Sequence, residues 1–305
     1  MTDLQRAFRF GVNSSTTSAQ DWLDVARKAE ALGYSTLIAQ DHFGNQFAPL
    51  PSLVAAGAVT SVLRLAAMVL DNDFRHPAAV AKEAATIDVL TNGRMELGLG
   101  AGWLQSDYDK TGIAYAAPGV RMERLAESVQ ICKALFCSEE PVSFTGKHYR
   151  VANLDTSPRP VQKPRPPIMI GGRQRRMLSL AAREADIVGI SLLDRRGSGL
   201  PEPPSFAQKV EWVRQAAGDR LSELEIHVNA SVVDITETPD ASIDQAAART
   251  GQTAARVRES PGTLVGSVDA ILEQLHARRE QYGVTYYVVH GRVMDAFAPV
   301  LARLR

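Results

Sequence analysis

The chain alternates short apolar runs with longer stretches in which apolar residues recur at helical spacing. Short apolar runs that end in turn residues predict buried strands, whereas apolar residues at i, i+3, i+4 and i+7 predict amphipathic helices. Trp22, Val25 and Ala26 begin one helical series, which Ser18 precedes as a candidate N-cap and Gly33 follows as a candidate terminator. The predicted strands cover 9–13, 34–39, 65–70, 94–100, 167–170, 185–190, part of 224–235, and 285–289.

Helical patterns fill most of the intervals between these strands, whereas 138–167 is rich in proline, lacks a helical period and carries a hairpin signal around Thr145-Gly-Lys147. Strands that alternate with helices over a chain of 305 residues are typical of a (β/α)8 barrel. A doubly wound open sheet usually carries Gly-x-Gly-x-x-Gly after its first strand, and 13–17 lacks that motif. We therefore predict an α/β fold, a TIM barrel with an insertion after strand 4 at about 138–167, as one domain over 1–305. The predicted helices are 18–32, 51–60, 77–91, 121–136, one between the fifth and sixth strands, 268–279 and 293–304, with 240–258 helical or irregular.

Composition and charge exclude several classes of protein. Lys+Arg and Asp+Glu are each 34, so the net charge is zero and no global field attracts nucleic acid or anionic lipid. No uncharged apolar run is long enough to cross a membrane, and the N-terminus lacks the apolar core of a secretory signal. Cys132 and Cys137 share no helix face for a disulfide and lack a second ligand pair for zinc. We expect a cytoplasmic protein without a membrane or nucleic-acid partner.

Barrel enzymes place their active sites at the carboxyl ends of the strands. Asp41 and His42 follow the second strand and are the acid–base candidates, because histidine titrates near neutral pH and a polar shell can fix its tautomer. The structural alternative is a histidine that caps a loop or satisfies a backbone carbonyl. Other polar residues and glycines at strand ends are Asn13, Asp71, Asn72, Gly100, Gly102, Gly171, Gly172, Gly189, Ser191, Asn229 and His290.

Two glycine-rich strand ends are candidate phosphate sites. Gly98-Leu-Gly-Ala-Gly102 ends the fourth strand, and glycines let backbone N–H groups approach an anion closely. Gly171-Gly172 ends the fifth strand, and Arg173, Arg175 and Arg176 follow at a helix start, which suits a phosphate better. The alternatives are tight turns that only pack and an exposed basic helix start. His290-Gly-Arg292 competes as an anion site, since barrel phosphates often sit after the last two strands.

A metal-dependent barrel hydrolase is the second class of function to consider. Such an enzyme needs several histidines and aspartates at strand ends, often as His-x-His. His42, His227 and His290 come from three separate strands, which is a weak triad signal. We expect no bound metal.

An ordered series of short motifs runs through nearly the whole chain. It resembles the bacterial luciferase-like flavin and deazaflavin oxidoreductases, especially their coenzyme F420-dependent branch. The specificity lies in the ordered set, because no single motif is decisive. The motifs are 40–42, 71–77, 92–94, 97–103, 144–149, 167–172, 185–188 and 264–267.

The resemblance implies a flavin or F420 that lies across the strand ends and exchanges a hydride at its C5 position, while FMN members also activate oxygen. It implies that Asp41 and His42 face the ring and the substrate as catalytic residues. It also implies an unusual cis peptide in the strand-three bulge and a homodimer. The implied cofactor-binding residues are Asn13, Met68, Val69, Leu70, Asp71, Gly100, Ala101, Gly102, Gly171, Gly172, Arg173, Gly189, Ile190 and Ser191.

One position departs from the family pattern. The sugar-phosphate dehydrogenases of the F420 branch carry a glutamate after the strand-four glycines, where this chain has Trp103. Tryptophan cannot donate a proton to the substrate, but it can stack on a ring or line an apolar pocket. We therefore predict an F420-dependent oxidoreductase that acts on a small, fairly apolar organic substrate with Trp103 in the substrate pocket. The alternative cofactor is FMN, in a luciferase-like monooxygenase, and the arginines after Gly172 favour F420.

Overall fold

The computed structural model describes residues 6–192 and 203–305. In this part of the chain, eight strands form a closed barrel in the order β1-β12-β9-β8-β7-β4-β3-β2. The pairs β1–β12, β12–β9, β9–β8, β7–β4, β4–β3 and β3–β2 are parallel, which confirms the predicted (β/α)8 architecture. The barrel strands are β1 (Arg9–Asn13), β2 (Thr36–Ala39), β3 (Arg64–Asp71), β4 (Met95–Gly100), β7 (Ile168–Gly172), β8 (Ile187–Ile190), β9 (Glu225–Asn229) and β12 (Val284–His290).

Helices follow most of the strands, and several begin where the sequence predicts. The Ser18 hydroxyl accepts a hydrogen bond from the Asp21 backbone N–H, and Gly33 takes a positive φ of 81° after the first helix. No helix of the described residues is both long and apolar enough to cross a membrane. The helices are α1 (Ala19–Leu32), α2 (Pro49–Ala58), α3 (Pro77–Leu90), α4 (Gln105–Thr111), α5 (Pro118–Cys137), α6 (Arg175–Glu184), α7 (Phe206–Ala217), α8 (Pro239–Thr250), α9 (Ala254–Glu259), α10 (Val268–Tyr282) and α11 (Met294–Arg303), with 3-10 turns η1 (Asn72–Phe74), η2 (Gly218–Glu223) and η3 (Gly291–Val293).

The chain divides by its internal contacts into two compact units. The first unit comprises 1–13, 31–35 and 172–305, and it carries β1, β8, β9 and β12. The second unit comprises 14–30 and 36–171, and it carries β2, β3, β4 and most of β7.

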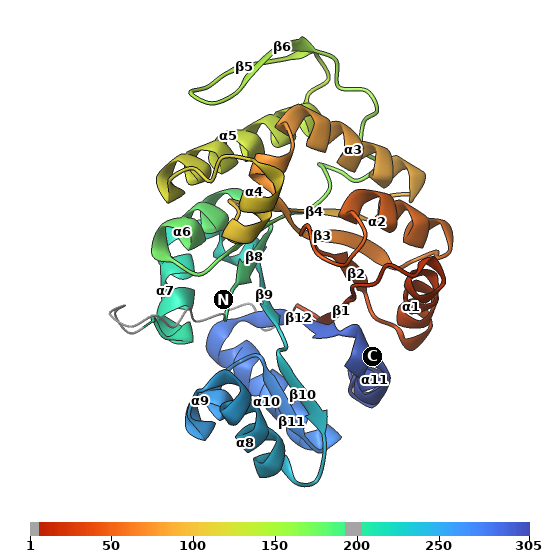
Figure 1. Cartoon of the computed structure of the whole chain (residues 1–305), viewed down its shortest axis with the longest axis vertical. Helices are drawn as coiled ribbons and strands as arrows, with labels where there is room; N and C mark the ends of the chain where they lie inside the picture. The colour runs from red at the N-terminus through yellow and green to blue at the C-terminus, as the bar shows by residue number, and fades with distance from the viewer. Residues whose placement is uncertain (1–5, 193–202) are drawn as a thin grey trace. The chain divides into compact units, whose positions relative to one another are not determined.

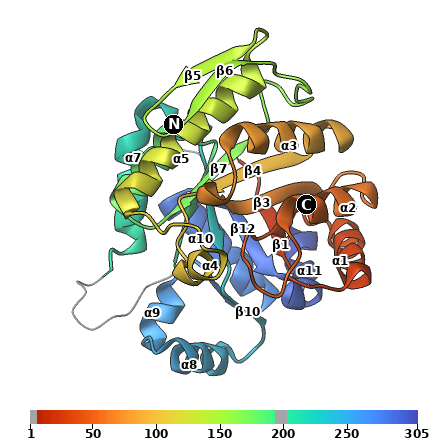
Figure 2. The same ribbon diagram turned by 45° about the horizontal axis from the view of Figure 1, so that its top comes forward.

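The second unit contains the predicted insertion. Strands β5 (Val142–Thr145) and β6 (Arg150–Leu154) form an antiparallel hairpin beside α5 (Figures 1 and 2), which confirms the hairpin signal. The Glu127 carboxylate on α5 accepts hydrogen bonds from the backbone N–H groups of 147–149. The Tyr149 hydroxyl accepts a hydrogen bond from Asn72 Nδ2 at 3.1 Å, so the hairpin tip also contacts the residue after β3.

The first unit contains a small parallel sheet outside the barrel. β10 (Val232–Ile235) pairs with β11 (Thr263–Gly266), and α8 and α9 cover this pair with Ile243 and Val257 (Figure 1). The expected single strand in 224–235 therefore divides in two, because Ala230 and Ser231 carry the chain from the barrel to the outer sheet.

Candidate active site

The loop after β2 places Asp41 in a partly buried ion pair. Arg75 donates to both Asp41 carboxylate oxygens, from Nη1 to Oδ2 at 2.6 Å and from Nη2 to Oδ1 at 3.1 Å. The Asp71 backbone N–H also donates to Asp41 Oδ2 at 3.0 Å. Charge-assisted bidentate pairs of this kind fix geometry as well as contribute energy. Asp41 therefore ties the end of β2 to the end of β3, and its predicted catalytic role stays a prediction.

His42 is the more exposed member of the predicted acid–base pair. Its side chain is 25% exposed, and Nδ1 lies 2.8 Å from Oδ2 of Asp107, whose side chain is 5% exposed. The Trp103 ring meets the His42 ring edge-on, with centroids 5.7 Å apart. Trp103 is 48% exposed, so it presents apolar surface beside the imidazole. Among the described residues no hydrogen bond engages His42 Nε2, which leaves that atom available to a ligand.

Asp107 and Tyr108 are neighbours on α4, a helix that the sequence analysis did not predict. The Tyr108 hydroxyl donates to the Asp71 carboxylate, 2.9 Å from either oxygen. Burial raises the pKa of Asp71 to about 6. The hydrogen bonds from the Asp73 backbone N–H and the Tyr108 hydroxyl lower this pKa, but they do not cancel the effect of burial. Burial and the adjacent Asp71 carboxylate raise the pKa of Tyr108. Asp71 is therefore a buried carboxyl group that titrates nearer to neutral pH than an ordinary aspartate.

Gly102 makes the contact between Tyr108 and Asp71 possible. Its φ is +70°, and a Cβ there would lie 1.8 Å from the Tyr108 hydroxyl oxygen and 2.5 Å from Asp71 Oδ2. Buried Arg121 donates to the carbonyls of Ala101 and Gly102 at 3.1 and 2.6 Å. Hydrogen bonds from an arginine of α5 thus fix the backbone of the predicted cofactor residues Ala101 and Gly102.

The bulge in β3 packs against the glycines of β4. The Met68–Val69 peptide is cis, as the resemblance implied, and the register of β3 on β4 shifts between Ala67 and Leu70. A Cβ at Gly100 would lie 2.5 Å from Val69 Cγ2, so this glycine is needed for packing.

Gly171, at the end of β7, differs from Gly100. A Cβ at position 171 would meet only Val69 Cγ1, at an ordinary contact distance of 3.6 Å. Gly171 is partly exposed, and its φ lies outside the left-handed region. The protein's own packing therefore does not require a glycine at this position.

The first unit brings Gly172 and Ser191 together. The Ser191 N–H donates to the Gly172 carbonyl at 2.8 Å, and buried Lys209 of α7 donates to the Ser191 carbonyl at 2.9 Å. Gly189 and Ile190 are buried in β8. Sequence reasoning missed Lys209, because no strand-end position or motif marks it.

Helix α6 begins just after Gly172 and Arg173. Its N-cap, Gln174, makes no side-chain capping bond, and Arg175 and Arg176 in its first turn are exposed. Open backbone N–H groups at a helix N-terminus and nearby guanidinium groups favour an anion. This segment therefore has the donors that the sequence predicted for a phosphate.

His227 and His290 are the other two histidines that the sequence analysis considered as metal ligands. His227 is buried in β9, and among the described residues neither of its ring nitrogens has a hydrogen-bond partner. Burial, and to a smaller extent the Arg9 charge, lowers its pKa to about 3. His290 at the end of β12 pairs with Asn13 at the end of β1. The His290 Nδ1 accepts a hydrogen bond from the Arg292 backbone N–H. In 6–192 and 203–305, no group of three or more His, Cys, Asp or Glu could hold a metal ion. The metal-dependent hydrolase therefore has no support among these residues.

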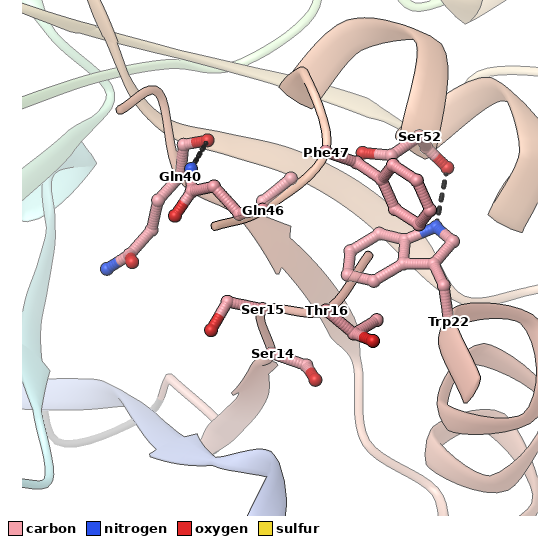
Figure 3. A pocket seen from close by; sticks show the side chains of 9 residues that line it. Ser14, Ser15, Thr16, Trp22, Gln40, Gln46, Phe47 and Ser52 are labelled. Atoms are coloured by element: carbon pink, nitrogen blue, oxygen red, sulfur yellow. Dashed lines mark hydrogen bonds between the residues drawn. The ribbon is translucent and has the colours of Figure 1, made fainter. Parts of the chain in front are cut away.

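A small pocket lies next to Gln40, at the end of β2 (Figure 3). Gln46 Nε2 donates to the Gln40 carbonyl at 2.7 Å, and Trp22 Nε1 donates to the Ser52 carbonyl at 2.7 Å. The lining is made of hydroxyl, amide and aromatic groups without a charged side chain, so it suits a neutral polar group rather than an anion. The residues are Ser14, Ser15, Thr16, Trp22, Ala39, Gln40, Gln46, Phe47 and Ser52.

Comparison with known proteins identifies the family. Residues 6–283 match the model of the luciferase-like monooxygenases. The chain belongs to the luciferase-like monooxygenase family. It is therefore an enzyme of the oxidoreductase class, as the sequence predicts, and its relatives include both F420-dependent and FMN-dependent enzymes.

Three relatives show which kinds of protein this luciferase-like chain is similar to. An uncharacterized protein of Mycobacterium tuberculosis is 30% identical over 72% of this chain and 80% of its own length. An F420-dependent glucose-6-phosphate dehydrogenase of Microbacterium testaceum is 31% identical over 58% of this chain and 55% of its own. An FMNH2-dependent dimethylsulfone monooxygenase of Pseudomonas fluorescens is 32% identical over 54% of this chain and 48% of its own.

A solved structure supports the fold. An F420-dependent secondary alcohol dehydrogenase in complex with an F420–acetone adduct superposes with a TM-score of 0.78 over 98% of this chain and 100% of that chain. The two sequences are 16% identical, so the likeness concerns the barrel alone.

Proposed function

We propose that this luciferase-like protein is an F420-dependent oxidoreductase that transfers a hydride between F420 and a small, fairly apolar organic substrate. The observation that carries the choice of cofactor is the cationic start of α6. Exposed Arg175 and Arg176 stand in the first turn of a helix whose N-terminus has no side-chain cap. F420 carries a phosphate and glutamates in its tail, and this larger negative charge favours a cationic rim more strongly than FMN does.

The residues present fit such a cofactor within each unit. In the first unit, the α6 N-terminus supplies donors for a phosphate, and Arg173, Gly189, Ile190 and Ser191 stay predicted contacts. In the second unit, Gly171 is partly exposed and leaves its backbone open beside Val69. When bound, F420 supplies the hydride chemistry at its C5 position.

The chain's own part is to orient the substrate and to hold or move a proton. His42 Nε2 is the atom that we propose for the proton, because the side chain is partly exposed and that nitrogen has no partner within residues 6–192 and 203–305. The Trp103 ring contacts the His42 ring, Phe43 follows His42 in sequence, and these two aromatic residues are 48% and 52% exposed. These rings favour a substrate with an apolar body, and they make a sugar phosphate a poor fit.

FMN is the second candidate cofactor, because a monooxygenase that uses FMNH2 matches this chain about as well as an F420-dependent enzyme does. Parallel fluorescence titrations of the purified chain with F420, FMN and FAD distinguish them. We expect F420 to bind with a Kd of about 1 μM or tighter, corresponding to about −8 kcal/mol, and FMN to bind more weakly. Co-purifying FMN that F420 cannot displace would overturn the choice of F420 and support the monooxygenase.

We also propose a cytoplasmic homodimer. The support for the dimer is the family resemblance, and the support for a reducing compartment is that Cys132 and Cys137 are both free thiols. Light scattering coupled to size-exclusion chromatography tests the dimer, and a monomeric mass at micromolar concentration contradicts it.

A further inference from the structure

The pairing of His42 with Asp107 has a geometry that a surface contact lacks. The two side chains are 65 positions apart in sequence, and Nδ1 of the imidazole lies 2.8 Å from Asp107 Oδ2. The Asp107 side chain is 5% exposed, whereas the imidazole is 25% exposed. The carboxylate is therefore buried more deeply than the ring, and it engages only the Nδ1 side of the imidazole.

Helix α4 is fixed in the orientation that this pairing requires. Asp107 and Tyr108 are consecutive, and they reach two different strand ends: Asp107 pairs with His42 after β2, and the Tyr108 hydroxyl donates to Asp71 at the end of β3. The Thr111 hydroxyl donates to the Asp107 carbonyl at 2.8 Å, which secures the last turn. A buried, hydrogen-bonded support of this kind holds a side chain in one rotamer.

A carboxylate only accepts hydrogen bonds, so Nδ1 must carry the proton that the pair shares. In a neutral imidazole the lone pair then lies on Nε2, which has no hydrogen-bond partner in the part of the chain that the structure describes. The edge-on contact with Trp103, at 5.7 Å between centroids, restrains the ring from a further side. We infer that Asp107 is a positioning residue, which fixes the Nδ1–H form of His42 and directs Nε2 toward the substrate as the proton-transfer atom. This inference rests on the proposed function only in the use that it gives to Nε2.

The tautomer can be measured without cofactor or substrate. Long-range 1H–15N correlation spectra of the 15N-labelled full chain report which ring nitrogen of each histidine carries the proton, and His42→Gln assigns the signal. We expect the Nδ1–H pattern in the wild type at a pH where the ring is neutral. Asp107→Ala should shift His42 toward the Nε2–H form, which a free imidazole favours in water. A wild-type His42 in the Nε2–H form, or an unchanged Nδ1–H form in Asp107→Ala, overturns the inference.

Two further variants separate positioning from folding. Asp109→Ala removes an exposed carboxylate from the same helix and should leave the His42 signals unchanged. Asp107→Asn keeps the side-chain volume but loses the charge that favours Nδ1–H, so it should weaken the Nδ1–H pattern even if Asp107→Ala does not fold. An Asp107→Asn protein with a fully wild-type pattern contradicts a role for the charge.

Turnover supplies an independent measurement. With the cofactor and substrate that the titrations identify, Asp107→Ala should lower kcat by about ten- to a hundredfold and change KM and the cofactor Kd by less than about twofold. Equal losses in Asp107→Ala and Asp109→Ala would contradict the inference. If F420 fails to bind while the Nδ1–H pattern is present, the proposed cofactor is wrong and the positioning by Asp107 stands. If F420 binds while His42 is in the Nε2–H form, the positioning is wrong and the proposed cofactor stands.

Discussion

A methyl group at position 171 should reduce cofactor binding without a cost in stability. The added Cβ meets only Val69 Cγ1, at 3.6 Å, so Gly171→Ala creates no clash within the protein. Replacing glycine by alanine at a compatible φ stabilises by about 0.4–1 kcal/mol, because the unfolded chain loses conformational freedom. A ligand in contact with this backbone is displaced by the methyl group, and we expect the F420 Kd to rise at least about tenfold, which is about 1.4 kcal/mol.

Gly100→Ala is the matched control. Its Cβ would lie 2.5 Å from Val69 Cγ2, and overpacking of this kind costs about 1–3 kcal/mol. Urea denaturation should therefore show a lower midpoint for Gly100→Ala and an unchanged or higher midpoint for Gly171→Ala, while F420 titration monitors binding in both proteins. Wild-type affinity in Gly171→Ala, or a loss of stability in it as large as that in Gly100→Ala, would refute the reasoning.

Three other expectations concern the residues around the site. The pKa of Asp71 is raised to about 6, so the folded state binds more protons than the unfolded state between the ordinary aspartate pKa and that value. This contribution to stability is present at low pH and is lost as the pH rises from about 4 to about 6. Asp71→Asn should therefore reduce the decrease in the free energy of unfolding that urea denaturation measures across that pH range. An identical pH profile in the wild type and Asp71→Asn contradicts this expectation. Arg75→Met leaves the buried Asp41 carboxylate without its cation and should cost about 3 kcal/mol in the same assay, whereas a change below about 1 kcal/mol would place the pair among weak surface contacts. Glu127→Ala removes the acceptor of the 147–149 backbone N–H groups, so hydrogen exchange of these amides should accelerate while that of the barrel strands does not, and unchanged exchange rates count against the anchor.

The barrel could be predicted because its strands and helices differ in hydrophobic period. Ser18 and Gly33 bound α1 through local capping chemistry, which depends on residues that are close in sequence. The division of 224–235 could not be predicted in this way. Both halves are apolar, and the partner of the second half is β11, whose four residues lie some distance downstream. Strand pairing over such a separation leaves no trace in the local pattern.

In the candidate site, too, the sequence predicted residues from their local position but not from contacts between distant parts of the chain. His42 was found because it follows a strand, and strand ends are where barrel sites lie. Asp107 was missed because the buried residues of α4 are Asp107 and Tyr108, so the helix has no apolar stripe for a periodicity argument to detect. The ion pair of Asp41 with Arg75 was missed for a different reason: both residues are charged, and only the folded chain shows that they meet.

The contact between Tyr149 and Asn72 connects the insertion, a segment outside the barrel, to a buried residue that directly follows β3. Asn72 stands between two carboxylates that Tyr108 contacts, so a change in the length or tip of the β5–β6 hairpin acts directly on their surroundings. Related proteins that differ in this insertion can therefore diverge in reactivity while every barrel strand stays the same. For protein engineering, the hairpin tip is a place to alter the chemistry of the site from outside the barrel.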